Sequence, residues 1–286
     1  MVFEYKIEKL DFSIDSDMDK LVELQNIVYR GKHCFTSSSF KYWYLDNPNG
    51  HVISYNALYG DIIAAHYALI PINIDVLDKT VKGLLSMATV THPDHRGQGL
   101  FKTLAKASYD YAKNNGFKFV IGVANADSFP GFIKYFDFDI VGQLEVLVGF
   151  SNNIKQKGDK LFKVHWDDDS LKWRSNRTGY TKDESTLYGT KGFWKFNDCP
   201  GVKTFLGKVD SCVLREIPIK IVNQFIRPLN LYVGLGSNAK DIGYIDVPKF
   251  FKRSPFNLIF MDLTGGSLPK MTKDNIFFQL MDFDVA

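Results

Sequence analysis

The chain has 286 residues, of which 45% are apolar and 23% are charged, and its 24 Phe and 14 Tyr make it rich in aromatic side chains. This length predicts one large or two modest globular domains. The net charge of +3 divides into −3 over residues 1–150 and +6 over the remainder. A mildly basic second half suits an anionic small-molecule acceptor, but no basic run is dense enough to predict nucleic-acid binding.

The sequence also argues against two further classes, secreted or membrane-spanning proteins and metal-binding proteins. Residues 1–6 lack the basic and apolar regions of a signal peptide, and no apolar stretch approaches a membrane-spanning length, so we expect a cytoplasmic protein without a membrane partner. Cys34, Cys199 and Cys212 are odd in number and lack metal-ligand spacing, which is typical of reduced thiols. The six histidines are scattered, so we expect no metal site.

The first third of the chain predicts alternating strands and helices. A strand over residues 3–10 precedes a helix that Ser16 or Asp17 can cap and that carries Leu21, Leu24, Ile27 and Val28 at helical spacing. A short amphipathic piece follows over residues 36–50 and ends in turn-forming residues. Strands are then expected at 52–59 and 62–73, joined by a turn at Tyr59-Gly60-Asp61.

The most informative stretch reads as strand, glycine turn and helix. Residues 84–90 are apolar and favour a strand, which Pro93 ends because it lacks a backbone donor. Apolar residues then recur at helical spacing from Leu100 to Tyr111, until Asn114-Asn115-Gly116 closes the helix. The turn Arg96-Gly97-Gln98-Gly99 therefore lies at a helix N-terminus, where unpaired N–H groups and the helix dipole favour a phosphate.

Two common phosphate-binding loops do not match this turn, because it lacks both Gly-Lys-Ser/Thr and the three-glycine dinucleotide pattern. It resembles the pyrophosphate-binding motif Arg/Gln-x-x-Gly-x-Gly/Ala of the GCN5-related N-acetyltransferases (GNAT). Pro93, Arg96 and Gly99 match, whereas Phe101 stands where Gly or Ala is usual. The alternative is an ordinary strand-turn-helix with glycines in a tight turn.

The resemblance implies an α+β fold with a mixed α/β sheet, an acyl-CoA N-acyltransferase fold, and acetyl-CoA as the coenzyme. The residues that it implies for coenzyme binding fall into three groups. They are Thr89, Val90 and Thr91 for the pantetheine arm, Arg96, Gly97, Gln98, Gly99, Leu100 and Phe101 for the pyrophosphate, and Asn125 and Ser128 after a second strand at 117–123.

The catalytic residues are less clearly marked. The family often has Tyr-x-x-x-Gly-Phe before its last strand, with the Tyr protonating the departing thiolate, but Ile133 occupies the tyrosine position here. Tyr135, two residues along, is the substitute that the sequence offers. For the base, His66, His92, Asp94, Glu145 and a water relay stay open, and of these we select His66 and Glu145. A hydrogen-bonded histidine within a sheet is the structural alternative for His66.

The second half predicts a separate α/β domain. Residues 151–160 are polar and mark a boundary, giving domains 1–150 and 151–286. Trp43, Asn47 and Leu58-Tyr59-Gly60 partly repeat about 130 residues later as Trp173, Asn176 and Leu187-Tyr188-Gly189. Strand-like runs are found at 204–209, 211–214, 230–235, 257–261 and 276–285, with a helix expected over 217–225.

We interpret this half as a second domain that resembles the acetyltransferase fold, is degenerate for coenzyme binding, and completes the acceptor groove. The Arg-Gly-x-Gly turn does not recur in residues 151–286. A coincidental repeat is the alternative. The expected acceptor-binding residues are Trp43, Tyr44, Asn47, Trp173 and Arg174. An aromatic anchor that only packs a short helix is the structural alternative for the first segment.

The sequence therefore predicts a coenzyme A-dependent N-acetyltransferase that acts on the primary amine of a small molecule, such as an amino sugar or a nucleotide-linked amino sugar. An aminoacyl or longer-chain acyl transferase is the alternative within the superfamily. A non-catalytic acyl-CoA sensor is the alternative from another class, and the missing tyrosine favours it. The oligomeric state is left open.

Overall fold

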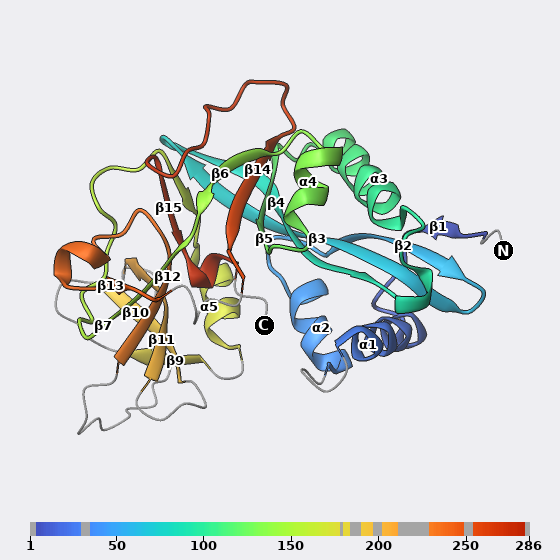
Figure 1. Ribbon diagram of the computed structural model, residues 1–286, viewed down its shortest axis with the longest axis horizontal. Helices are drawn as coiled ribbons and strands as arrows, with labels where there is room; N and C mark the ends of the chain where they lie inside the picture. The colour runs from blue at the N-terminus through green and yellow to red at the C-terminus, as the bar shows by residue number, and fades with distance from the viewer. Residues whose placement is uncertain are drawn as a thin grey trace.

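The computed structural model of the chain describes residues 4–29, 35–177, 180–183, 190–196, 202–210, 229–248 and 254–283. Within these ranges, no helix combines the length and the apolar character needed to cross a membrane. The chain folds into two mixed sheets with helices on their faces (Figure 1).

The first sheet has the strand order β1-β2-β3-β4-β5-β14-β6. Its strands are β1 (Lys6–Glu8), β2 (Ile53–Tyr59), β3 (Ile62–Val76), β4 (Lys79–Thr91), β5 (Phe119–Ala124), β14 (Asn257–Asp262) and β6 (Asp139–Gln143). All neighbours are antiparallel except β4 and β5, which run parallel and so require the crossover helix between them.

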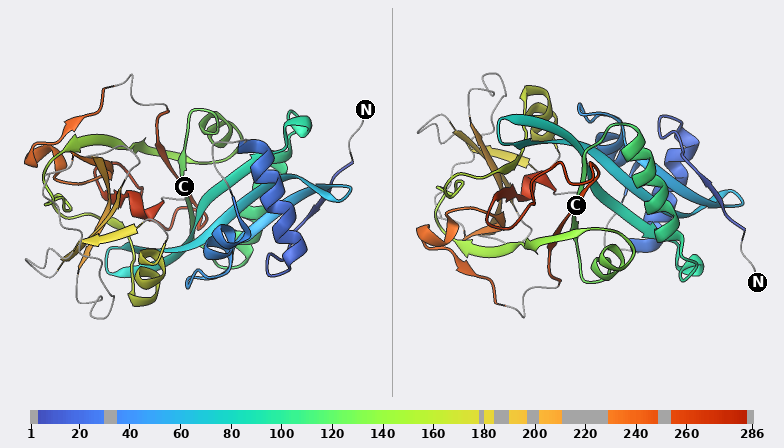
Figure 2. Two further views of the ribbon diagram at one scale, coloured as in Figure 1. Left: turned by 90° about the horizontal axis from the view of Figure 1, so that it is seen from below. Right: turned by 90° about the horizontal axis from the view of Figure 1, so that it is seen from above.

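Helices cover both faces of this sheet (Figures 1 and 2). On one face lie α1 (Asp15–Tyr29) and α2 (Ser37–Tyr44), and on the other lie α3 (Leu100–Asn114) and α4 (Phe129–Tyr135). The alternation of strand side chains divides the core accordingly into two clusters. Helix α3 buries Leu100, Leu104, Ser108 and Ala112, which recur every four residues and form one stripe.

The second sheet has the order β9-β10-β11-β12-β7-β13. Its strands are β9 (Tyr180–Asp183), β10 (Thr190–Phe196), β11 (Val202–Asp210), β12 (Leu229–Leu235), β7 (Glu145–Gly149) and β13 (Ile245–Asp246). Helix α5 (Asp168–Ser175) precedes β9, and a short 3-10 helix, η3 (Ala239–Ile242), follows β12.

The two sheets exchange one strand each. Strand β14 comes from the second half of the chain but pairs with β5 and β6, while β7 comes from the first half but pairs with β12 and β13. The two sheets share one pattern of strand directions. Strands β11 and β12 are parallel, as β4 and β5 are, and the other neighbouring strands compared between the two sheets are antiparallel in both. The predicted domain boundary near residue 150 stays a prediction. Each sheet contains one strand from the other side of this boundary.

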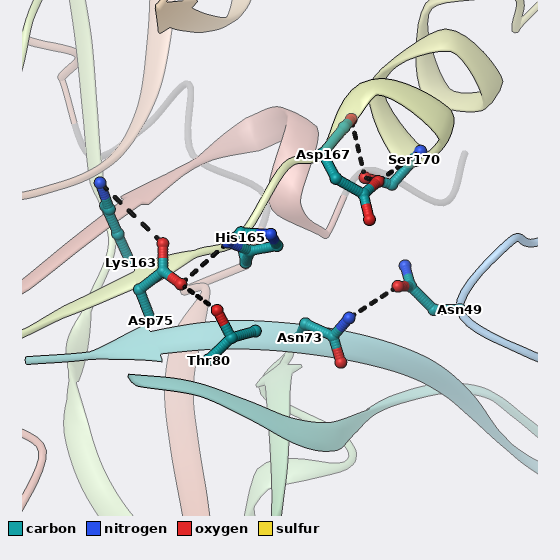
Figure 3. A network of polar contacts seen from close by, with 8 residues as sticks. All are labelled: Asn49, Asn73, Asp75, Thr80, Lys163, His165, Asp167 and Ser170. Carbon is teal, nitrogen blue, oxygen red and sulfur yellow. Dashed lines mark hydrogen bonds and ion pairs between the residues drawn. The ribbon is translucent and has the colours of Figure 1, made fainter. Parts of the chain in front are cut away.

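Two further strands join the sheets into one continuous path. Strand β8 (Phe162–Val164) pairs with the far end of β3, and β15 (Ile276–Gln279) pairs with β8 and with β12. Figure 3 shows the polar contacts at this junction, where Asp75 on β3 accepts hydrogen bonds of 2.9 Å from Thr80 and from His165 Nδ1 and lies 3.9 Å from Lys163 Nζ. These contacts fix the second half against the first sheet.

Most predicted elements are confirmed with small changes of boundary. The strand expected at 84–90 is the end of β4, the helix expected from Leu100 is α3, and the runs at 204–209, 230–235 and 257–261 lie in β11, β12 and β14. The closing strand expected over 276–285 is found as far as Gln279 and is wrong over residues 280–283, while residues 284 and 285 lie outside the described part of the chain. The Asp282 carboxylate accepts the Gln279 N–H at 2.7 Å and closes a 3-10 turn, η5 (Leu280–Asp282). The strand at 211–214 and the helix at 217–225 lie outside the described residues.

Candidate functional site

The site begins where β4 and β5 separate. The two strands pair only from Leu84 with Val120 to Ser86 with Gly122, so the edge of β4 that faces β5 is open from Met87 to Thr91. A bulge in β4 coincides with this gap, because His66 and Ala68 on β3 pair with Val90 and Met87. Ala88, inside the bulge, has a φ of 50°, which is strained for a residue with a Cβ.

A cavity of about 180 Å³ fills the opening between the strands. Its walls come from both faces of the sheet: Leu85, Met87 and Val123 pack with the cluster under α1 and α2, whereas Phe132 and Ile259 belong to the cluster under α3 and α4. The lining residues are Tyr29, Leu85, Ser86, Met87, Ala88, Thr89, Gly122, Val123, Ala124, Asn125, Ser128, Phe132, Ile259 and Phe283. The cavity therefore passes through the sheet.

The glycine turn lies at the far end of the open β4 edge. Gly97 and Gly99 have φ values of 77° and 71°, and Gly99 is the residue before α3. A Cβ at either position would meet no atom within 4 Å, so packing does not require these glycines. The left-handed backbone does require them, and the space above the turn is open to a ligand. Unpaired N–H groups at the start of α3 and the positive end of its dipole suit a pyrophosphate there.

Asn125 presents a donor at the cavity wall. Its Oδ1 accepts hydrogen bonds from Asp127 N at 3.0 Å, Ser128 N at 2.9 Å and Ser128 Oγ at 3.0 Å, which fixes the orientation of the side-chain amide. The Nδ2 group then faces away from this turn and is available to a ligand. The turn and the amide both follow from the sequence Asn125-x-x-Ser128, which precedes α4.

The residues predicted to bind the coenzyme lie along one path from the turn to the cavity. Thr89, Asn125 and Ser128 line the cavity. Val90 is 4% exposed and Leu100 6%, so only their main chains can face a ligand. Phe101 packs on Phe132, and Arg96 donates from Nε to the Thr91 carbonyl at 3.4 Å. Their role in coenzyme binding stays a prediction, as does that of Gly97, Gln98, Gly99 and Thr91.

His66 lies outside the cavity and is a hydrogen-bonded histidine within the sheet, which was the structural alternative to a catalytic base. It is 1% exposed, its Nδ1 is 2.7 Å from Asn56 Oδ1, and its Nε2 is 2.8 Å from the Tyr44 hydroxyl. Because Asn56 Oδ1 can only accept, Nδ1 carries the proton and Tyr44 donates to Nε2. Burial lowers the pKa of His66 to about 3. These contacts favour a satisfied sheet histidine over the predicted base.

The buried imidazole of His66 makes stability depend on pH. Because its pKa is about 3 in the folded state and about 6.5 in the unfolded state, protons bind preferentially to the unfolded chain below pH 6.5. We expect the free energy of unfolding to lose up to about 1.4 kcal/mol per pH unit from this group between pH 6 and 4. Denaturant unfolding of wild type and His66→Gln at matched pH values measures the difference.

Asp282 contributes a slope of opposite sign, because burial raises the pKa of its carboxyl to about 7 and the folded chain then holds the extra proton. This slope is common to the wild type and His66→Gln, so it cancels in the comparison. Parallel curves for the two proteins would contradict the assignment of a neutral, buried His66.

Tyr135 and Glu145 also lie outside the cavity lining. Tyr135 is 44% exposed at the end of α4, with the ammonium groups of Lys102 and Lys134 each 5.3 Å from its ring centroid. Glu145 begins β7 in the second sheet, and its Oε1 is 3.0 Å from Lys240 Nζ. Neither side chain borders the gap between β4 and β5. Their catalytic roles stay predictions without support from the geometry.

The predicted acceptor-binding residues meet at the junction between the two halves. The ring of Trp173 on α5 stacks on Tyr42 of α2 with centroids 4.9 Å apart, and its Nε1 donates to the Tyr42 carbonyl at 3.0 Å. The guanidinium of Arg174 lies 4.4 Å from the ring of Trp43, and both residues are buried. The two segments of the partial repeat therefore pack on each other.

Tyr44 and Asn47 are buried next to this junction. Tyr44 bonds to His66, and Asn47 Nδ2 donates to the Pro71 carbonyl at 2.9 Å. An acceptor role for the five residues stays a prediction, and their contacts favour the packing alternative.

Several lining residues were not predicted. Gly122 carried a signal, because a glycine inside a strand marks a bulge or a site of close approach. Ser86 is a polar residue within an otherwise apolar strand. Ile259 and Phe283 carried no signal, since they reach the cavity only through the exchanged strand β14 and the end of the chain. Within the described residues, no group of three or more His, Cys, Asp or Glu side chains is placed to hold a metal ion.

Comparison with known proteins agrees with this geometry. A family model described as an acetyltransferase (GNAT) domain matches residues 12–141. No curated protein matches the sequence. Residues 12–141, which include the parted strands and the glycine turn, form an acyltransferase domain. This part of the chain is similar to the GCN5-related N-acetyltransferases.

Solved structures share the fold across both halves of the chain. A probable N-acyltransferase, a conserved protein of unknown function from Enterococcus faecalis V583, has a TM-score of 0.61 at 9% identity, covering 91% of this chain and 73% of that one. A GCN5-related N-acetyltransferase from Kribbella flavida gives 0.60 at 8%, covering 92% and 73%. Saccharomyces cerevisiae N-myristoyltransferase with bound myristoyl-CoA gives 0.56 at 7%, covering 92% and 80%. The predicted mixed-sheet acyltransferase fold is confirmed.

Proposed function

We propose that the protein transfers an acetyl group from acetyl-CoA to the primary amine of a small molecule, with an amino sugar or nucleotide-linked amino sugar as the acceptor class. One observation carries the proposal: the open edge of β4 leads without interruption from the glycine turn before α3 to the cavity between β4 and β5. A coenzyme with a pyrophosphate at one end and a thioester at the other suits this path.

The residues of the path fit the parts of the coenzyme. The N–H groups after Gly99 would hold the pyrophosphate, the β4 edge from Met87 to Thr91 would pair with the amides of the pantetheine arm, and Asn125 Nδ2 would donate to it. When bound, acetyl-CoA supplies the thioester that the amine attacks. The backbone around the bulge at Ala88 would direct N–H groups at the carbonyl oxygen, as an oxyanion hole does.

The size of the cavity favours a short acyl group. Its volume of about 180 Å³ lies below the range of roughly 300–1,000 Å³ that is usual for sites of drug-sized ligands. A longer-chain acyl transferase is the second candidate, supported by the similarity to an N-myristoyltransferase with bound myristoyl-CoA. A non-catalytic acyl-CoA sensor is the third, supported by the exposed position of Tyr135.

We infer further that the second half is a degenerate copy of the same fold. The shared pattern of pairing around β4–β5 and β11–β12, the exchanged strands and the packing of Trp43 on Trp173 support this reading. In this proposal, the second half shapes the acceptor side of the cleft without binding coenzyme.

Thiol release separates the three candidates. The purified protein is incubated with acetyl-CoA or myristoyl-CoA and a panel of amines, including amino sugars, and free thiol is measured over time. We expect amine-dependent release from acetyl-CoA and a higher Tm with acetyl-CoA than with adenosine or acetate. Thiol release only from myristoyl-CoA would favour the longer-chain acyl transferase over the acetyltransferase. A Tm increase with no release across the panel would favour the sensor.

A further inference from the structure

A chain of three hydroxyl groups ends at the cavity. Ser86 lines the cavity on β4, and its Oγ is 2.8 Å from the hydroxyl of Tyr67 on β3. The Tyr67 hydroxyl is in turn 2.6 Å from the hydroxyl of Tyr109 on α3. Tyr67 is fully buried and Tyr109 is 6% exposed, so neither hydroxyl has ready access to bulk water.

The direction of the hydrogens along this chain follows from counting donors. Within the described part of the molecule, Tyr67 is the hydrogen-bond partner of the Tyr109 hydroxyl, so a satisfied Tyr109 donates to Tyr67. Tyr67 then donates to Ser86. The hydrogen of Ser86 is left for the cavity, which makes Ser86 an oriented donor.

The space beside Ser86 is kept open by a glycine. Gly122 pairs with Ser86 across β4 and β5, and a Cβ at Gly122 would lie 3.2 Å from the Ser86 Cβ. The hydroxyl of Ser86 is on the face of the sheet that carries Tyr67 and α3, the same face on which Ser128 and Phe132 of the α4 segment border the cavity.

We propose that Ser86, oriented by Tyr67 and Tyr109, donates a hydrogen bond to the sulfur atom of coenzyme A as it leaves the acyl group. This inference rests on the proposed function and deepens it. It assigns the role of stabilising the leaving group to a residue on β4, since Tyr135 lies outside the cavity. Ser86 is the catalytic residue of the three, and Tyr67 and Tyr109 are positioning residues.

The step balances without transfer of a proton from protein. The amine nitrogen forms a bond to the acyl carbon, the carbon–sulfur bond breaks, and sulfur keeps the electron pair while the amine proton passes to solvent. Burial raises the pKa of Tyr67 and of Tyr109, so both keep their protons. Ser86 therefore supplies a hydrogen bond to the thiolate and not a proton.

The test measures ionisation of the bound thiol instead of turnover. Ultraviolet absorbance of the thiolate is followed against pH in complexes of free coenzyme A with wild type, Ser86→Ala and Ser108→Ala. The control Ser108 also has a buried hydroxyl, but it donates to the Leu104 carbonyl within α3 and is not part of the cavity lining. We expect Ser86→Ala to raise the pKa of the bound thiol by about one unit, which is a tenfold loss in thiolate affinity, and Ser108→Ala to leave it unchanged.

Desulfo-coenzyme A, which lacks the sulfur, provides the second arm. Its affinity should be equal for wild type and Ser86→Ala, while coenzyme A above the pKa of the thiol should bind the variant about tenfold more weakly. Tyr67→Phe should raise the thiol pKa by less than Ser86→Ala does, because Ser86 keeps its donor but loses its orientation. Ser86→Cys, with a weaker donor, should fall between wild type and Ser86→Ala and serves if the alanine variant does not fold.

An unchanged pKa of the bound thiol in Ser86→Ala would overturn the inference. If turnover fell while this pKa stayed the same, Ser86 would act on the carbonyl oxygen and not on the sulfur. A failure of wild type to bind coenzyme A at all would instead contradict the proposed function. The two failures are therefore distinguishable.

Discussion

Gly99→Glu is expected to abolish binding of acetyl-CoA while leaving the fold intact. At one hundred times the dissociation constant, acetyl-CoA should stabilise the wild type by about 2.7 kcal/mol, and the variant should show none of this increase. The added side chain would occupy the open space above the turn, and its charge would lie where the pyrophosphate belongs. A negative charge at a helix N-terminus is otherwise favourable, so the loss would not come from the helix itself.

Gly116→Glu is the matched control at the other end of α3. Gly116 has a φ of 81°, and a Cβ added there would meet no atom within 4 Å, so the substitution has the same backbone cost as at Gly99. It should lower Tm in the absence of ligand and keep the full shift with acetyl-CoA. Thermal unfolding with and without ligand measures both variants. A normal shift in a folded Gly99→Glu protein would mean that the turn is structural only.

Cutting the chain in two should give halves that fold only together. The exposed turn at Gly158 and Asp159 separates a first fragment that contains β5, β6 and β7 from a second that contains β12, β13 and β14. Alone, the first fragment lacks the strand between β5 and β6 and exposes apolar surface, as Ile259 and Leu258 of β14 are fully buried. We expect each fragment alone to be aggregated or unfolded, and the coexpressed pair to copurify and bind acetyl-CoA.

One substitution within the buried strand β14 and one just before it sharpen this test. Ile259→Lys, at a fully buried position, should prevent copurification, whereas Phe256→Lys, at a position that is 38% exposed and precedes β14, should not. A first fragment that unfolds cooperatively as a monomer on its own would contradict the structural role of the exchanged strands.

The local elements of the fold were predictable because their signals are local. The strand before Pro93, the helix stripe of α3 and its end just before Gly116 follow from spacing and turn chemistry. The exchange of β7 and β14 could not be predicted, because apolar strands of similar composition fit either sheet and only long-range packing decides between them. The partial repeat at Trp43 and Trp173 was visible in the sequence, but the packing of these two residues on each other was not, and their role in an acceptor groove stays a prediction.

The candidate site was predictable where a backbone conformation or a motif defines it. Gly97 and Gly99 of the motif form the turn before α3, with left-handed φ values, and Asn125 lies at the cavity through the turn that it caps. His66 could not be placed from sequence, because the period-two alternation of a strand gives its face but not the neighbours Tyr44 and Asn56 that satisfy it. The link from Ser86 to Tyr67 and Tyr109 spans three elements, so no local pattern contains it.

A crystal structure of the complex with coenzyme A tests the central claim most directly. We predict the pyrophosphate at the N–H groups that follow Gly99, the pantetheine arm along β4 between Met87 and Thr91, and the sulfur within hydrogen-bond distance of Ser86 Oγ. Coenzyme A bound at another surface, or a gap between β4 and β5 that excludes it at saturating concentration, would contradict the assignment of this cavity as the acyl-transfer site.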